Sequence, residues 1–278
     1  MTFMTKSLST IVLLLAGCAA LIGHAANGPD TVDAGAAVRL ETLRQRPEVA
    51  GTRVYRGAVY AQSADTDTAA NTATTAPLFT YERRVAATDT GLSATHITRG
   101  PDQQIVVVEE ARFTPAYALQ RFDAVNPQQG FSGSVVVSPG GRHLQYQLLR
   151  DGKLSTASEE VSDPVVAGPS VHGFVLQHWD SLANGQPLAV RMIVLADKTS
   201  YGFQIRQLPP QDGLTSFAIT PSSVFVRLMI APLKVSFDSK TRALVRYEGR
   251  VPPMRQDGHK RVDLDARVDY LMDQASYR

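Results

Sequence analysis

Apolar and polar residues alternate with a period of two along most of the chain. Leu188, Val190 and Met192, for example, share one face of such a stretch, and Arg191 lies on the other. This period is typical of antiparallel strands with one buried and one solvated face. The predicted strands cover residues 52–61, 78–86, 92–99, 104–113, 118–125, 131–137, 143–149, 153–159, 187–195, 201–206, 214–219, 233–237, 245–250 and 262–270.

One stretch follows a helical period instead. Its apolar residues recur at three- and four-residue spacings, at Val171, Phe174, Val175, Trp179 and Leu182. This spacing predicts one helix over about residues 170–183, capped by Ser170 and closed at Asn184-Gly185. Gly173 is an unfavourable residue inside a helix, so it indicates close approach of a neighbouring backbone. The apolar stripe needs a partner surface.

The two patterns together predict a mainly β fold. A long antiparallel meander would form a curved half-barrel or barrel, with the helix packed centrally against its concave face. We expect residues 52–278 to form a single β-rich domain. Residues 62–76 are polar and of low complexity, which predicts a mobile loop because they have almost nothing to bury.

The first 26 residues are typical of an export segment. Lys6 precedes an apolar run over residues 11–22 that is too short to span a membrane stably. Two cleavage sites are compatible with this run. Leu15-Ala16-Gly17-Cys18 matches a lipoprotein signal, in which Cys18 would be lipidated, whereas Gly23-His24-Ala25-Ala26 fits a general signal peptidase.

Either cleavage predicts an exported, periplasmic protein. Lipidation of Cys18 would anchor it to the outer membrane, and this lipid would be its only membrane attachment. Residues 27–51 would then serve as a leader or tether. Since Cys18 is the only cysteine, the rest of the chain has no disulfide and no thiolate metal site.

The second half carries a motif that resembles an uncharacterised family of bacterial envelope proteins. The resemblance covers about residues 170–270. It is carried by His178-Trp179-x-x-Leu182-x-x-Gly185, by Tyr201-x-Phe203, and by Ala231-Pro232-Leu233-x-Val235-x-Phe237-Asp238-x-x-Thr241-x-x-Leu244-x-x-Tyr247-x-Gly249. In layout, the chain looks like half-barrel proteins that carry lipids or lipoproteins across the periplasm, which implies a carrier architecture but does not determine function.

Composition and motifs argue against several functions. The net charge of +2 and the lack of a basic run give no indication of nucleic-acid binding. His172 and His178 are not spaced as a zinc-binding pair on a helix. Asp263, Asp265 and Asp269 share a strand face, but Arg267 shares it too, so we interpret this face as solvated. No catalytic residue, metal site or cofactor is predicted.

These patterns favour a non-enzymatic protein that binds an apolar ligand, such as a lipid acyl chain, between helix and sheet. The candidate cavity residues are Phe174, His178, Trp179, Tyr201, Phe203, Phe237 and Tyr247. The same aromatic side chains could instead fill the core. One alternative is therefore a structural or adaptor lipoprotein that binds another envelope protein. A second alternative is a hydrolase or isomerase that uses His178.

Overall fold

The computed structural model describes residues 52–62, 76–228 and 230–272. These residues form a mainly β protein, as the alternation predicted, with one large sheet and few helices. The predicted export segment, Cys18, the leader and the predicted loop, except for its two end residues, lie outside the described residues.

The sheet contains fifteen strands. They are β1 Arg53–Ala61, β2 Phe79–Thr88, β3 Gly91–Arg99, β4 Ile105–Phe113, β5 Leu119–Asn126, β6 Phe131–Val137, β7 His143–Arg150, β8 Lys153–Glu160, β9 Val165–Val166, β10 Leu188–Val194, β11 Thr199–Gln207, β12 Leu214–Pro221, β13 Leu233–Asp238, β14 Leu244–Asp257 and β15 Lys260–Met272. Strand β9 falls in a segment that the alternation left without structure, because two residues are too few to show a period.

The first and last strands of the described chain, β1 and β15, pair with each other in the middle of the sheet. Strand β1 pairs with β2 on one side and with β15 on the other. One arm then runs from β1 to β8 and the other from β15 to β9. All pairings are antiparallel except that of β9 with β10. Turn chemistry sets the hairpins: Asp151 and Gly152 both take positive φ between β7 and β8, as a tight hairpin turn requires.

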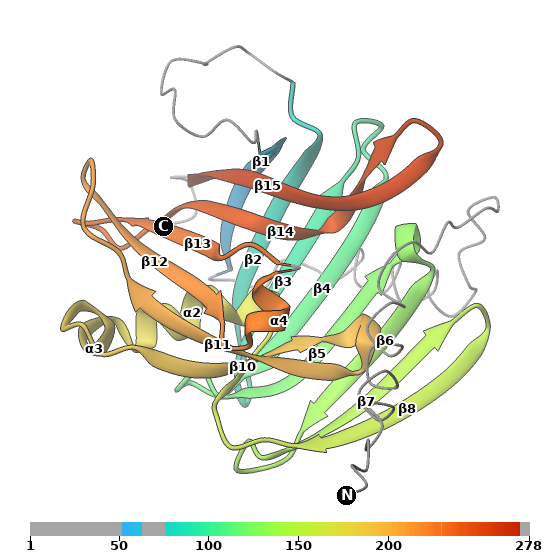
Figure 1. Ribbon diagram of the computed structural model, residues 1–278, viewed down its shortest axis with the longest axis horizontal. Helices are drawn as coiled ribbons and strands as arrows, with labels where there is room; N and C mark the ends of the chain where they lie inside the picture. Colours follow the sequence, from blue (N-terminus) through green and yellow to red (C-terminus); the bar gives the residue numbers. More distant parts are fainter. Residues whose placement is uncertain (1–51, 63–75, 229, 273–278) are drawn as a thin grey trace, which may run out of the picture.

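The sheet bends strongly but does not close into a barrel (Figure 1). Its edge strands β8 and β9 are consecutive along the chain, so the two edges lie close together. Side chains bridge this seam: Lys198 Nζ donates to Ser155 Oγ at 2.9 Å, and Arg191 Nη2 lies 3.6 Å from Glu159 Oε2. Side-chain contacts therefore cover the β8 edge without a backbone ladder.

The predicted helix exists but is divided. Helix α2 spans Gly168–Gln177 and α3 spans Trp179–Ala183, with the break at His178. Ser170 is not the cap: α2 begins earlier, and Ser170 Oγ accepts from the N–H of Ala167 at 2.9 Å. Gly185 has positive φ after α3, as predicted for the end of the helix.

Three short helical segments complete the described structure. The 3-10 helices are η3 Pro127–Gln129 and η4 Leu195–Asp197, and the last helix is α4 Val224–Arg227. Two residues separate the end of β12 at Pro221 from the start of α4.

Helix α2 lies inside the bend of the sheet and contacts both arms. It packs on β3 and β4, and its apolar residues join a core cluster with β10 to β14. This cluster, which we call the helix cluster, consists of Val166, Val171, Phe174, Val175, Trp179, Leu182, Val190, Phe203, Ile205, Phe217, Ile219, Leu233, Val235, Phe237 and Leu244. The apolar stripe of the helix and the dry faces of the strands therefore bury each other.

Candidate functional site

A row of polar side chains crosses the inner face of the first arm. Tyr55 on β1 is paired with Arg83 on β2, Arg83 with His96 on β3, and His96 with Glu109 on β4. Residues paired in this way lie on the same face of a sheet. Four neighbouring strands therefore direct one aromatic and three ionisable groups to the same side.

The first turn of α2 covers this row. Arg83 Nη2 donates to the carbonyl oxygen of Pro169 at 3.3 Å. The carboxylate of Glu109 lies beside Gly168, where a Cβ would be 3.5 Å from Oε2. His172 brings a further ionisable side chain from the helix. We call Arg83, His96, Glu109 and His172 the interior polar cluster.

His172 lies between the interior polar cluster and the helix cluster. Its ring lies edge-on to Tyr55 at 5.8 Å and stacks on Phe237 at 5.4 Å with an interplanar angle of 15°. Tyr55 belongs to β1 and Phe237 to β13. His172 is therefore held between aromatic rings from the two arms.

Three tyrosines surround the other side of the cluster. Tyr81 packs edge-on against His96 at 5.0 Å and against Tyr270 at 5.5 Å. The residue between Tyr81 and Tyr270 in the sheet is Gly57, which pairs with both. Without a side chain at Gly57, the two rings can meet across β1. Tyr247 completes the set, and its hydroxyl donates to the Arg250 carbonyl oxygen at 2.6 Å.

Burial sets the protonation of these groups. Desolvation raises the pKa of Glu109 to about 7. Burial lowers the pKa of His96 and of His172 well below the ordinary value, and the positive charge of Arg83 lowers both further. Burial also lowers the pKa of Arg83, but a guanidinium begins so high that it stays charged. Near neutral pH, the cluster thus holds a cation, two neutral imidazoles and a half-ionised carboxyl.

Several polar atoms of the cluster lack a hydrogen-bond partner within the described residues. They are Nε and Nη1 of Arg83, Nε2 of His96 and Nε2 of His172. His96 Nδ1 lies 3.8 Å from Glu109 Oε2, which is too long for a hydrogen bond. Buried polar groups in folded proteins are normally satisfied, so this concentration of unsatisfied atoms distinguishes the cluster from the rest of the core.

Part of the cluster retains accessible surface. The side chains of His96 and Glu109 are 12% and 14% exposed, although burial shifts the pKa of each. Tyr81, Tyr247 and Tyr270 are also only partly buried. These partly accessible groups border the buried part of the cluster. Arg83, at 1% exposure, lies behind them.

The residues that the sequence suggested for a cavity lie mostly in the helix cluster. Phe174, Trp179, Phe203 and Phe237 are buried members, and Tyr201 and Tyr247 pack against it. The Trp179 ring meets Phe217 at 5.2 Å and Phe237 at 5.4 Å, both edge-on.

His178 lies at the break between the two helices, away from the interior polar cluster. Its ring packs on Phe174 at 4.4 Å. An enzyme that uses His178 would need a carboxylate or hydroxyl within hydrogen-bond reach. Among the described residues, none makes a hydrogen bond or ion pair with this ring.

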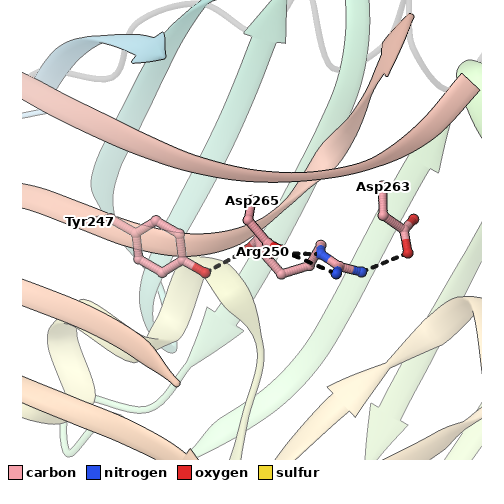
Figure 2. A network of polar contacts seen from close by, with 4 residues as sticks. All are labelled: Tyr247, Arg250, Asp263 and Asp265. Carbon is pink, nitrogen blue, oxygen red and sulfur yellow. Dashed lines mark hydrogen bonds and ion pairs between the residues drawn. The ribbon is translucent and has the colours of Figure 1, made fainter. Parts of the chain in front are cut away.

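The aspartate face on β15 is occupied by arginines. Figure 2 shows Arg250 reaching Asp263 and Asp265, with distances of 2.6 Å from Nη1 and 2.8 Å from Nε. Arg246 Nε similarly donates to Asp269 at 2.7 Å. Within the described part of the chain, no group of three or more His, Cys, Asp or Glu side chains is placed to hold a metal ion.

Sequence patterns did not single out Arg83, His96 or Glu109 as site residues. The alternation did place all three residues in successive predicted strands: Arg83 in 78–86, His96 in 92–99 and Glu109 in 104–113. Finding them together required the strand register, which depends on turn lengths and on the register shift at Thr98/Arg99 between β3 and β4.

A scan against protein-family models finds no match, and a search of curated proteins finds no relative. None of the described helices is long and apolar enough to cross a membrane. The functional inference therefore depends on the geometry of the interior polar cluster.

Proposed function

We propose that this protein is a non-enzymatic component of the bacterial cell envelope that binds an apolar ligand, such as a lipid acyl chain, between α2 and the inner face of the sheet. The observation that carries the proposal is the interior polar cluster, with its unsatisfied atoms and partly accessible tyrosines. Ligand sites typically combine an apolar lining with a few polar groups at defined positions.

Apolar residues adjoin the cluster on two sides. Tyr247 and Tyr270 pack against the helix cluster and also against a second apolar cluster, formed by Val59, Phe79, Leu264, Ala266 and Val268. An acyl chain that entered beside these tyrosines would replace water with apolar contacts, at about 0.8 kcal/mol for each buried CH₂ group. The polar atoms of the cluster would meet the other end of the ligand.

Trp179 provides a test, because it is the only tryptophan in the chain. Stearate methyl ester carrying a nitroxide on its acyl chain should quench Trp179 fluorescence saturably, with one ligand per protein. Native mass spectrometry of protein purified from the envelope should show bound lipid that organic extraction removes. Linear, unsaturable quenching together with lipid-free native protein would contradict the proposal.

A second candidate function is an adaptor that binds another envelope protein. It is favoured by an uncovered apolar patch on α4 and the residue after it, where Val224, Phe225 and Leu228 are 65%, 77% and 81% exposed. Exposed contiguous apolar surface commonly marks interaction sites. Phe225→Gln should then abolish crosslinking to a defined partner in intact cells, whereas Leu271→Gln, an equally exposed site on β15, should not. Equal crosslinking by both variants would exclude α4 as the contact.

A further inference from the structure

From the interior polar cluster we infer that Arg83 binds the acidic head group of an acyl ligand, a single negative charge carried on oxygen. A fatty-acid carboxylate and a lipid phosphodiester share this chemistry. The inference rests on the proposed function, because it assigns the polar end of the ligand whose chain the protein would bind.

Arg83 is a buried cation with unused donors. The Arg83 side chain is 1% exposed. Within the described chain, this side chain makes one hydrogen bond, from Nη2 to the Pro169 carbonyl oxygen. The Tyr55 ring, 5.6 Å from the guanidinium carbon, compensates part of the charge. Nε and Nη1 have no hydrogen-bond partner in the part of the chain that the structure describes. A buried charge is costly unless it is paired and hydrogen-bonded, so an anion at these nitrogens would complete the site.

No described carboxylate performs this role. None forms an ion pair with Arg83 within the described residues, and the nearest one in the cross-strand row, Glu109, is two strands away. Glu109 is also only half-ionised near neutral pH, since burial raises its pKa to about 7. Among the described residues, the buried cation therefore has no full counter-charge.

The groups around Arg83 suit a monoanion. His96 and His172 are neutral, because burial and the charge of Arg83 lower the pKa of both, and a neutral imidazole can donate one hydrogen bond. Tyr81 and Tyr270 keep their hydroxyl protons, because burial raises the pKa of both phenols. One cation surrounded by neutral donors matches one negative charge, whereas a dianion would leave charge uncompensated.

The site also predicts a pH dependence. Three titratable groups lie close to Glu109: Tyr81 from β2, His96 from β3 and Tyr247 from β14. Around them stand Arg83 on β2, Arg53 and Tyr55 on β1, His172 on α2 and Tyr270 on β15. Within the interior polar cluster, only Glu109 changes charge near pH 7. Its ionisation would place a negative charge beside the bound oxyanion, so an acidic ligand should bind more tightly at pH 6 than at pH 8. Glu109→Gln should remove that difference.

The decisive experiment compares a charged ligand with its neutral ester. Nitroxide-labelled stearate and its methyl ester are titrated against Trp179 fluorescence at pH 7.5, below their critical micelle concentrations. A hydrogen bond to a charged group corresponds to about tenfold or more in affinity, so the wild-type protein should bind the acid at least about tenfold more tightly. Arg83→Met should reduce this ratio to about one without weakening ester binding.

Arg84→Met is the matched control. Arg84 is the next residue on β2, points to the opposite face and pairs with Glu82 at 2.6 Å. It should retain the wild-type ratio. If Arg83→Met does not fold, the wild-type protein still tests the inference. Equal affinities of the wild-type protein for acid and ester would overturn it. A preserved ratio in folded Arg83→Met overturns it as well.

Two further outcomes separate the possibilities. Displacement of the labelled stearate by palmitoyl lysophosphatidylglycerol at a concentration at least about tenfold lower than that of neutral monopalmitoylglycerol would extend the site to phosphodiesters. Equal potency of the two competitors would restrict the site to carboxylates. Saturable binding of both acid and ester with equal affinity rejects the role of Arg83 and leaves the proposed function intact. Saturable binding of neither ligand rejects both.

Discussion

Glu109→Gln tests the protonation of the interior polar cluster through protein stability. The carboxyl is 14% exposed, and burial raises its pKa from the ordinary 4.5 to about 7. The folded state therefore holds this proton more tightly than the unfolded state. The stabilisation from the neutral carboxyl is fully present below pH 4.5, and it is lost as the pH rises to about 7.

The size of the change in unfolding free energy follows from the shift in the pKa of Glu109. A displacement from 4.5 to about 7 at 1.36 kcal/mol per pH unit corresponds to about 3 kcal/mol overall. Between pH 5 and pH 8, the wild-type protein should lose about 2–3 kcal/mol of unfolding free energy through this group. Glutamine keeps the size of the side chain and remains neutral, so Glu109→Gln should not show this loss.

Urea unfolding followed by circular dichroism at pH 5 and pH 8 measures the effect. His96 and His172 oppose the trend below pH 6.5, because burial lowers their pKa and folding then disfavours their protonation. The difference between variant and wild type cancels their contribution. Glu160→Gln, at a side chain that is 73% exposed, serves as control and should change stability by less than about 0.5 kcal/mol at either pH. An equal change in unfolding free energy between the two pH values in Glu109→Gln and wild type would contradict a raised pKa at Glu109.

Three further substitutions test the packing. Gly173→Ala should destabilise the protein by about 1–3 kcal/mol in urea unfolding, because the new Cβ would overlap the Tyr117 ring. Adding Tyr117→Ala to this variant should recover part of the lost stability. An unchanged unfolding curve for Gly173→Ala would contradict this contact. Trp179→Ala should cost about 3–5 kcal/mol by removing a ring that is 7% exposed, and a cost below about 1 kcal/mol would show a loosely packed site. Arg250→Ala, which removes partly exposed ion pairs to Asp263 and Asp265, should cost less than about 1 kcal/mol at low salt and still less at high salt.

Local pattern predicted most of the described strands, because a strand half-buried in a sheet requires a period of two wherever it lies. The hairpin at Asp151-Gly152 was likewise predictable, since a tight turn needs two residues that tolerate positive φ. The helix was predicted by its period but not by its ends. Its start at Gly168 and its break at His178 depend on what packs around them.

The close approach that Gly173 indicated is real, but its partner is a side chain rather than backbone. The ring of Tyr117, which itself stacks on Phe113 at 5.0 Å, occupies the space beside Gly173. The period of a helix identifies which face is buried, and it contains no information about which loop residue will cover it. Tyr117 lies in the turn after β4, far from α2 in sequence.

The sequence by itself determined the fold class and the existence of nearly every element, since both follow from local alternation and turn residues. Tertiary structure alone decided that Arg83, His96 and Glu109 face one another and that His172 closes over them. A shift of one residue in strand pairing would send each of these groups to the opposite face. These groups become buried only because α2 lies across the row. That burial raises the pKa of Glu109 and encloses the charge of Arg83.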